Sequence, residues 1–418
     1  MSNGLPPPSA ERLVADVHAL ERFTRPDRPY TRRAFSDEDR AARAWLAARM
    51  AEAGLDVGVD AAGNVIGRRA GRTAGAPLMI GSHLDTVQEG GRFDGIAGVL
   101  AGLEVARCLA AAGHRLARPL EVVNFTCEEP SEFGLSTIGS RAMSGRLDAE
   151  LAARFRDAAG RSLAEAIDSV GGRAARLDEA RRAPGSIARY LELHIEQSAS
   201  LDRAGVPVGV VTAIAAPTRF RITVRGRQDH AGGTPMAIRR DALAAAAEVV
   251  LAVERVAREV GRQMVGTVGT LEVRPNMVNI VPGEAWLLAD FRGIEPDAIA
   301  ETVGRFEAAA AEVAARRDVT VEVTPLMRES PLRISPEMVE HAAAAAEAVG
   351  VPYQRLVSGA SHDANHVATL CLAGMLFVPC HGGRSHCPEE WTEPADLAAG
   401  TRVLLELVLR LDRTLPEP

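Results

Sequence analysis

The sequence has few cysteines, and none of them stands in a closely spaced pair. A cysteine-based metal site shows CxxC pairs, and a disulfide framework packs its cysteines more densely than five in 418 residues. We therefore expect reduced thiols in a cytoplasmic protein. The residues concerned are Cys108, Cys127, Cys371, Cys380 and Cys387.

Long apolar runs and an excess of basic charge are also missing. Stretches such as ALAAAAEVVLAV are too short to cross a bilayer, and the proline-rich start MSNGLPPPSAERLVADVHAL lacks the apolar core of a signal peptide. The formal net charge is -7, whereas a general nucleic-acid binder needs a basic face. We therefore expect neither a membrane nor a nucleic acid as a partner.

The rest of the composition is that of an ordinary globular protein. Hydrophobic residues make up 47% of the chain and charged residues 25%, which allows a large core and more than one domain. Short apolar runs at 78–80, 120–125 and 190–193 alternate with helical patterns at 36–54, 96–112 and 147–183. This alternation predicts an α/β fold with a mostly parallel sheet covered by helices.

The pattern changes near position 215. TRFRITVRG alternates like a half-buried strand and is followed by a helical pattern at 236–259, the strands VGTVGTLEV and EAWLLADFR, a helix at 298–317 and the strand VTVEVTP. This βαββαβ order is typical of a ferredoxin-like domain. Because GMLFVPC later resumes the buried-strand pattern, we expect an inserted domain at 215–328 within a catalytic domain made of 1–214 and 329–418.

Histidines and acids follow four of the strand-like runs. PLMI precedes His83 and Asp85, EVVNF precedes a pair of glutamates, YLEL leads into His194, and MLFVP precedes the loop with His386. Residues at the carboxyl ends of strands in an open α/β sheet meet at one edge, so we expect these side chains to converge. Asp94 stands directly before a helix, and glycines beside it let the loop fold back toward His83.

These residue types indicate metal-assisted hydrolysis. Imidazole and carboxylate groups suit zinc, and two such sets that share a carboxylate hold two ions about 3.5–4 Å apart. Asp85 lies on the same side of an extended segment as His83 and can orient its imidazole. Of Glu128 and Glu129, one binds metal and the other handles protons. Each residue alone also fits a structural role, such as a core histidine or a solvated acidic pair, so the inference depends on their joint occurrence.

Seven motifs resemble the amidase/hydantoinase/carbamoylase family. They are GSHLDTVQEGGRFDGIAGVLAGLEV, NFTCEEP, ELHIEQ, DHAGGTPMAIRRDA, RPNMVNIVPGEAWLLADFRG, SGASHDA and GGRSHCPEEWT, in this order from about residue 20 to the C-terminus. The family includes N-carbamoyl-L-amino acid hydrolases, β-ureidopropionases and allantoate amidohydrolases, within a superfamily of dinuclear zinc aminoacylases and carboxypeptidases. The histidine of HIEQ separates it from the peptidase branch, which generally has an acid there.

The resemblance implies a centre with two divalent metal ions per chain. Zinc is the first candidate metal, and manganese, cobalt and nickel are the alternatives. Asp94 would bridge the ions, with Glu129 and His386 completing one site. The other site would take its remaining ligands from the histidines of HLD and HIEQ, His83 and His194. Glu128 would be the general base that activates water and then protonates the leaving nitrogen, with Asp85 beside it in the catalytic set.

The resemblance also implies roles for residues that alone read as turn or surface positions. Arg292 would grip a substrate carboxylate with its planar fork, and His230 would polarise the scissile carbonyl from the neighbouring subunit of a homodimer. The inserted domain would thereby serve as a lid and dimerisation domain. The other substrate-binding positions implied are Gln197, Asn276, Asn279 and His362.

The activity implied is cleavage of the C–N bond of an N-carbamoyl-L-amino acid or a related ureido acid. Allantoate amidohydrolase is the nearest alternative, and an aminoacylase or dipeptidase a weaker one. A non-catalytic binding protein would have lost a ligand or the base, and all are present. Departures from the family pattern, at Pro130, Glu132, Ser198 and Ser361, touch no implied ligand, but we expect them around the pocket, where they affect substrate choice.

Overall fold

The computed structural model describes residues 4–416, which form two compact units. The first contains the described residues up to Thr212, the segment Ile334–Ser358 and the described residues from His362 onward. The second contains Ala213–Arg333 with Gly359–Ser361. The chain thus leaves the first unit, forms the second and returns to the first.

A mixed sheet organises the first unit. Its strands follow the order β1-β2-β4-β3-β5-β15-β6, with β14 beside β6. The pairs β4–β3, β3–β5 and β5–β15 are parallel, whereas the pairs on either side of them are antiparallel. The strands are β1 Asp56–Val59, β2 Val65–Arg69, β3 Leu78–His83, β4 Leu120–Phe125, β5 Arg189–Ile195, β6 Val208–Ile214, β14 Tyr353–Ser358 and β15 Ala373–Val378.

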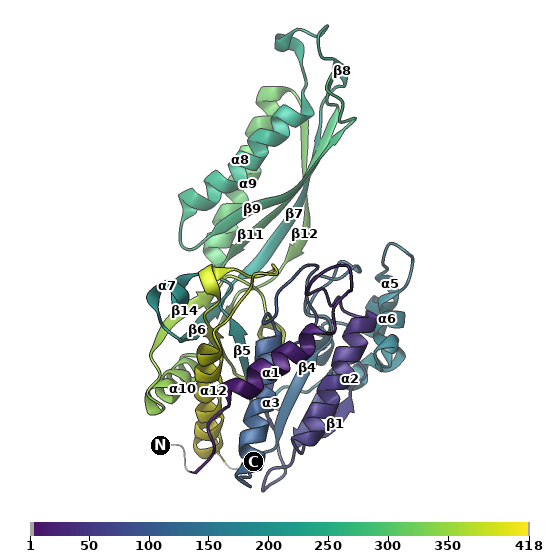
Figure 1. Ribbon diagram of the computed structural model, residues 1–418. Coiled ribbons are helices and arrows are strands. Elements are labelled where there is room, and N and C mark those ends of the chain that lie inside the picture. The colour runs from purple at the N-terminus through teal and green to yellow at the C-terminus, as the bar shows by residue number, and fades with distance from the viewer. Residues whose placement is uncertain (1–3, 417–418) are drawn as a thin grey trace. The chain divides into compact units, whose positions relative to one another are not determined.

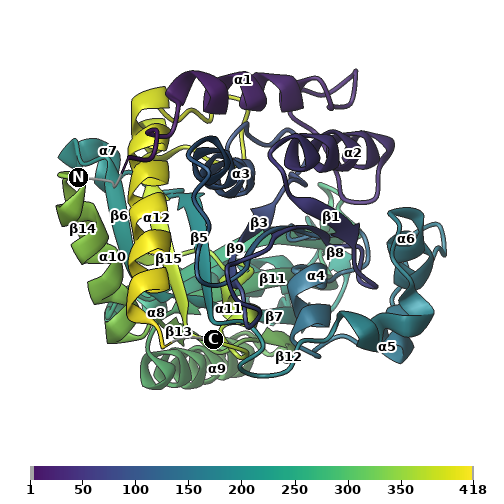
Figure 2. The same ribbon diagram turned by 90° about the horizontal axis from the view of Figure 1, so that it is seen from below.

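Helices cover both faces of this sheet. α3 packs on β3, β4 and β5 and lies beside α12, which packs on β15, while α4 and α11 lie on the other face (Figure 2). The helices are α1 Ala10–Glu21, α2 Asp37–Glu52, α3 Ile96–Ala111, α4 Ile138–Met143, α5 Ala149–Arg154, α6 Leu163–Ser169, α7 Ser200–Ala204, α10 Pro336–Ala348, α11 Ala364–Val367 and α12 Pro394–Thr414, with 3-10 turns at Ala174–Ala180 and His381–Gly383.

The apolar runs of the sequence correspond to the central strands of the sheet. Every residue of β3, β4 and β15 is buried, as expected for parallel strands covered on both faces. α2 begins as predicted, because the Ser36 side chain accepts a hydrogen bond from the amide of Asp39. All five cysteines are free, and no helix among the described residues is long and apolar enough to span a membrane.

The second unit has the predicted ferredoxin-like fold. Its antiparallel sheet has the order β12-β7-β11-β9, and α8 and α9 pack together on one face (Figure 1). Alternate residues of β11 are buried, and Phe220, Phe291 and Phe306 meet in the core under the helices. The main elements are β7 Ala216–Arg225, α8 Ala242–Val260, β9 Val265–Arg274, β11 Glu284–Gly293, α9 Pro296–Arg317 and β12 Thr320–Arg328.

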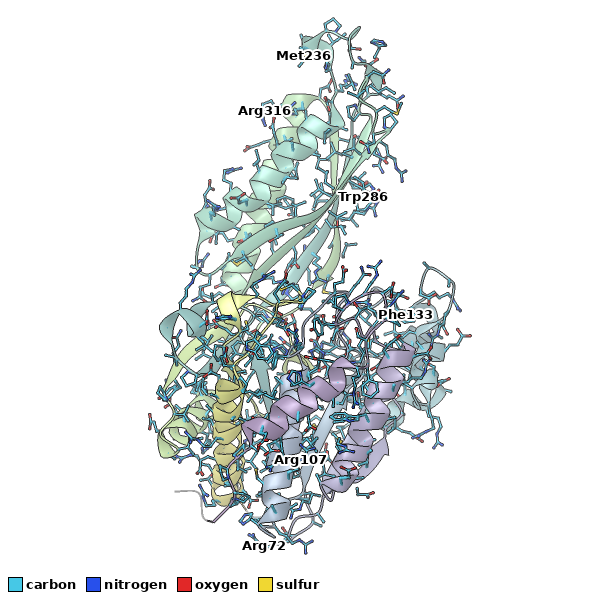
Figure 3. All side chains as sticks on the ribbon, viewed as in Figure 1. Arg72, Arg107, Phe133, Met236, Trp286 and Arg316 are labelled. Carbon is cyan, nitrogen blue, oxygen red and sulfur yellow. The ribbon has the colours of Figure 1, made fainter. Side chains whose placement is uncertain are left out.

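Smaller elements of the second unit lie at the ends of this sheet. β8 (Asp229–His230) and β10 (Ile280–Val281) form a short antiparallel ribbon beyond the end of β7 (Figure 1). The last residues of β6 pair with β13 (Leu332–Arg333). On the face opposite α8 and α9, Arg221 stacks on Trp286 at 4.2 Å, and Trp286 is labelled in Figure 3.

The helix predicted at 236–259 begins later than expected. Met236–Ile238 is a single 3-10 turn, and α8 starts at Ala242. The Asp241 side chain accepts a hydrogen bond from the amide of Ala244 and so caps the helix. The start predicted at Met236 was therefore wrong, because the capping aspartate rather than the apolar residues before it fixes the first turn.

Candidate metal centre

The first unit gathers the predicted metal ligands at the carboxyl ends of its central strands. His83 is the last residue of β3, and His194 lies near the end of β5. The adjacent acids 128 and 129 follow β4, and Asp94 lies just before α3. His386 comes from the loop between β15 and α12, where its backbone has a positive φ of 56°.

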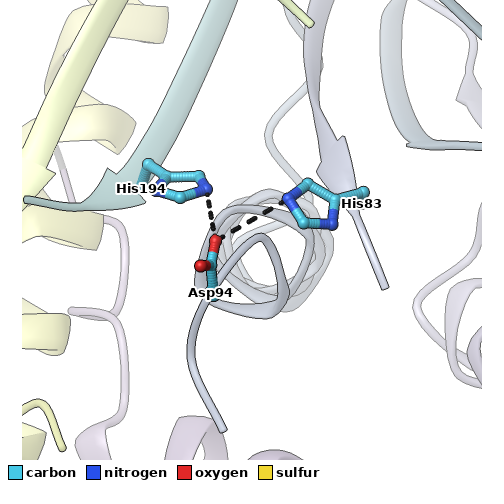
Figure 4. A group of neighbouring side chains, drawn as sticks. All are labelled: His83, Asp94 and His194. Atoms are coloured by element: carbon cyan, nitrogen blue, oxygen red, sulfur yellow. Dashed lines mark ion pairs between the residues drawn. The ribbon is translucent and has the colours of Figure 1, made fainter. Parts of the chain in front are cut away.

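Asp94 lies between two sets of side chains. Its Oδ1 is 3.1 Å from Nε2 of His194 and 3.9 Å from Nε2 of His83 (Figure 4). Its Oδ2 is 2.9 Å from Nε2 of His386, whose ring is in turn 3.5 Å from a carboxylate oxygen of Glu129. In each set of three, one possible ligand atom per residue lies within 4.8 Å of the others. The two sets therefore share one carboxylate.

The two strand-end imidazoles are oriented by main-chain carbonyls. Nδ1 of His83 is 3.0 Å from the carbonyl oxygen of Asp85, and Nδ1 of His194 is 3.0 Å from that of Ile195. A proton on Nδ1 satisfies each carbonyl and leaves Nε2 with the lone pair that a metal ion needs. The donor set therefore fits divalent ions.

The carboxylate of Asp85 contacts the loop after β4 as well as the imidazole. Its Oδ1 is 3.6 Å from Nδ1 of His83. Its two oxygens accept hydrogen bonds from the amides of Glu128 and Glu129, at 3.2 and 3.1 Å. Asp85 thus holds the adjacent acids in place beside the histidine that the sequence predicted it to orient.

A glycine makes room for the ligands. A Cβ atom on Gly95 would lie 2.3 Å from the imidazole of His83, and the φ of this residue is 69°. Both the close approach and the backbone conformation therefore require glycine at the start of α3. This explains one of the glycines beside the predicted ligands.

Burial shifts the pKa values of the cluster. Burial raises the pKa of Glu128 well above its usual range, and burial with the charge of Asp94 raises the pKa of Glu129 to about 7. The hydrogen bond to Asp94 raises the pKa of His386 to about 9. Burial opposes ionisation of Asp94, but hydrogen bonds from its two partner histidines hold its pKa well below the usual range. Without cations, the cluster keeps protons that bound metal ions would replace.

These shifts predict that metal affinity rises with pH. A proton on His386 is lost only near its pKa of about 9, and the proton on Glu129 near about 7. An ion must displace both protons, so we expect the apparent affinity to increase from about pH 6 to about pH 9. Calorimetric titration of chelator-treated protein measures this, and an affinity independent of pH over that range would contradict the proposed ligand set.

Gln197 has an unpartnered atom beside Asp94. Its Nε2 donates to Oδ2 of Asp94 at 2.8 Å, and its backbone has a φ of 57°. Its Oε1 is buried and has no hydrogen-bond partner among the described residues. A buried acceptor without a partner is costly, so this atom fits a donor that a bound molecule supplies.

His362 packs against His194, and a residue that the sequence analysis missed lies beside both histidines. Its ring centroid is 4.5 Å from that of His194, and Nε2 is 2.8 Å from the hydroxyl oxygen of Ser358. Glu192 is the missed residue, and it completes a third group of possible ligands with these two histidines. Its oxygens, however, accept hydrogen bonds from the Tyr190 and Ser82 hydroxyls and the amide of Ala364. Its position two residues before His194, on the same side of a strand, was the available signal.

The remaining predicted substrate residues lie in the second unit. His230 is exposed on β8, where its Nδ1 accepts hydrogen bonds from the amides of Gly232 and Gly233 at 3.1 and 3.0 Å. Asn279 accepts a hydrogen bond through its carbonyl from Ala231, in the same ribbon. Asn276 has a positive φ of 60°. Arg292 lies near the other end of the sheet, where Asp290 and the carbonyl of Gly359 accept its hydrogen bonds at 3.2 Å.

Comparison with known proteins shows the family. The model of peptidase family M20/M25/M40 matches residues 79–410. The chain is 43% identical to an N-carbamoyl-L-amino acid amidohydrolase of Geobacillus stearothermophilus, over 91% of this chain and 93% of that protein. It is 36% identical to a ureidoglycolate hydrolase of Arabidopsis thaliana, over 94% and 85%.

A solved structure agrees with these relatives. An amidase of the hydantoinase/carbamoylase family from Burkholderia multivorans matches with a TM-score of 0.86 at 35% identity, over 96% of this chain and 98% of that one. At that coverage the match extends over both units. The chain therefore belongs to peptidase family M20/M25/M40 and, within it, to the hydantoinase/carbamoylase family of amidohydrolases.

Proposed function

We propose that the protein uses two divalent metal ions to hydrolyse the C–N bond of an N-carbamoyl-L-amino acid. Zinc is the first candidate for these ions. The observation that carries this proposal is the pair of ligand sets sharing Asp94, with Glu128 beside them. The similarity to an N-carbamoyl-L-amino acid amidohydrolase over most of the chain supports the substrate class. His83, Asp94 and His194 would hold one ion, and Asp94, Glu129 and His386 the other. When bound, such ions lower the pKa of water and withdraw electrons from the substrate carbonyl.

Glu128 is the proposed general base. Its carboxylate is buried, 3.7 Å from Nε2 of His83, and burial raises its pKa well above the usual range. A base with a raised pKa takes a proton from attacking water and can return it to the leaving nitrogen. Asp85 would fix the main chain on which this base stands, through its hydrogen bonds to the two amides.

The proposed substrate contacts divide between the ends of an N-carbamoyl amino acid. Arg292 would bind the carboxylate. Asn276 and Asn279 follow the end of β9 on the His230 side of the second unit, so they would be further polar contacts from the same copy as His230. Gln197, whose Oε1 is unpartnered among the described residues, would accept a hydrogen bond from the carbamoyl group, with His362 beside it. His230 would donate to the carbonyl oxygen. Because its Nδ1 accepts from two amides, its proton lies on Nε2, which is then available as a donor.

The distance between His230 and Arg292 supports a homodimer. Arg225 pairs with Glu284 at the end of the sheet next to β8, whereas Arg292 pairs with Pro217 near the other end. Eight positions along β11 separate the two pairs, which is about 27 Å at about 3.4 Å per residue. One small substrate cannot contact both residues of one chain, so His230 would serve the site of a second copy.

Exposed apolar side chains near His230 fit the same interface. Met236 is 77% exposed and projects from the tip of the second unit (Figure 3), and Val278 is fully exposed. Ile238 and Met277 are also more than half exposed. Exposed apolar side chains of this kind, in the segments next to one ribbon, are typical of a surface that a partner covers.

A ureido acid of another kind is the second candidate substrate. The similarity to a ureidoglycolate hydrolase, at 36% identity over 94% of the chain, favours this class. Allantoate belongs to the same chemistry. All these substrates combine a carboxylate with a ureido group, so the same residues would contact them.

A turnover screen tests the proposal. The protein, loaded in turn with zinc, manganese, cobalt or nickel, would be offered N-carbamoyl-L-amino acids, ureidoglycolate, allantoate, β-ureidopropionate and N-acyl amino acids. We expect the fastest turnover with an N-carbamoyl-L-amino acid. Turnover of N-acyl amino acids alone, or of none of these compounds with any metal, would refute the proposed substrate class.

Replacing Arg292 with lysine tests the carboxylate contact. Arg292→Lys keeps the charge and loses the planar fork, so we expect KM to rise about tenfold or more, with kcat and metal content little changed. Steady-state kinetics with the best substrate measures both constants. Arg221→Lys, on the same sheet but stacked on Trp286, is the matched control, and an equal effect of both changes would contradict the assignment.

A further inference from the structure

Glu390 is a buried carboxylate next to the proposed metal centre. It lies in the loop between β15 and α12, four residues after His386, and is fully buried. Its Oε1 accepts hydrogen bonds from the amides of Phe93 and Asp94, at 2.7 and 3.0 Å. One carboxylate oxygen therefore fixes the main chain of the aspartate that the two ligand sets share.

The other oxygen of Glu390 reaches the same aspartate through a serine. The Ser385 hydroxyl lies 2.9 Å from Oε2 of Glu390 and 3.0 Å from Oδ2 of Asp94. Ser385 directly precedes His386 in the chain. Glu390 thus connects the Asp94 loop with the His386 loop at two points.

The Asp94 loop leaves space for this carboxylate. A Cβ atom at Gly91 would lie 1.9 Å from the carboxyl carbon of Glu390. Gly91 is not among the glycines with a positive φ, so the close approach, rather than backbone conformation, requires a glycine there. The second glycine of EGGRFDG is thereby explained.

We infer that Glu390 is a positioning residue that holds Asp94 and His386 at the separation needed by the ion of the Asp94, Glu129 and His386 set. The inference rests on the proposed two-metal function. Ser385, which Glu390 contacts, forms a hydrogen bond with Oδ2 of Asp94. That oxygen faces His386, whereas Oδ1 of Asp94 faces His83 and His194. Loss of the Glu390 side chain should therefore weaken the binding of this ion more than the binding of the other.

Cobalt binding to chelator-treated protein tests this inference, by calorimetry and by the visible absorption of the bound ion. We expect Glu390→Ala to bind one ion as the unaltered protein does and the other about 10–100-fold more weakly, as is usual when a group that orients a ligand is removed. Glu390→Gln should retain most of the affinity, because its amide oxygen still accepts from the two main-chain amides and its NH2 group can donate to Ser385. Glu389→Ala is the matched control, since this neighbour is 61% exposed and pairs with Arg384.

The result separates positioning from general support of the fold. Equal affinities in Glu390→Ala and unaltered protein, or equal weakening of both ions with a lower melting temperature of the metal-free protein, would overturn the inference. If Glu390→Ala does not fold, Gly91→Ala and Ser385→Ala decide: selective weakening of one ion in both supports the inference, and its absence in both overturns it. Unaltered protein that binds fewer than two ions contradicts the two-metal proposal itself, and the inference with it.

Discussion

Glu128→Gln is expected to keep the fold and both metal ions while losing turnover by a factor of about 10²–10⁴. Glutamine has nearly the same shape as glutamate but cannot take a proton from water. The side chain is buried, and burial raises its pKa well above the usual range, which suits a group that takes a proton from water. Metal analysis and steady-state kinetics of the purified variant measure the two effects separately.

Glu129→Gln provides the comparison. Glu129 lies 3.5 Å from the ring of His386 and belongs to one of the two ligand sets, so we expect this variant to lose metal as well as activity. Two variants with the same metal content and the same rate would show that the adjacent acids do not divide the work of base and ligand as proposed.

Mixing two inactive variants should restore activity if His230 serves a second copy. His230→Ala chains keep Glu128, and Glu128→Gln chains keep His230, so a mixed dimer contains one site with both groups. Random exchange of equal amounts gives half of the dimers this composition, and about a quarter of the unaltered activity should return. His230→Ala alone should lower kcat by about 10²–10³, as expected for loss of an oxyanion donor.

A matched mixture controls for exchange itself. Glu128→Gln and Glu129→Gln chains carry both defects in the first unit, so no mixed dimer of these has an intact site and no activity should return. Exchange can be followed with differently tagged chains. Confirmed mixed dimers of His230→Ala and Glu128→Gln without recovered activity would show that His230 does not act across subunits.

The sequence analysis predicted the fold best where its physical signal was strong. β4 has the predicted bounds, Leu120–Phe125, because a strand buried on both faces is a continuous apolar run. The antiparallel flanks of the sheet escaped prediction, since short, partly buried strands such as β1 and β14 carry no such run. The start of α8 was misplaced because the apolar residues Met236 and Ile238, which precede the capping Asp241, were taken as part of its helical pattern.

The candidate centre was predictable for a similar reason. Strand ends meet at one edge of an α/β sheet, and the family motifs identify which histidines and acids stand there. Glu192 and Glu390 were missed because most of their donors are distant in sequence: the Ser82 hydroxyl and the Ala364 amide for Glu192, and the amides of Phe93 and Asp94 for Glu390. Nothing in the pair Glu389–Glu390 distinguishes the buried acid from its exposed neighbour, and only the folded loop does so.

The most direct test of the two-metal account is the activity of chelator-treated protein during stepwise addition of zinc, with bound metal counted at each step. The two ligand sets that share Asp94 predict that full activity on an N-carbamoyl-L-amino acid returns only as the second ion per chain binds. Full activity with one ion per chain, or with none, would contradict the account.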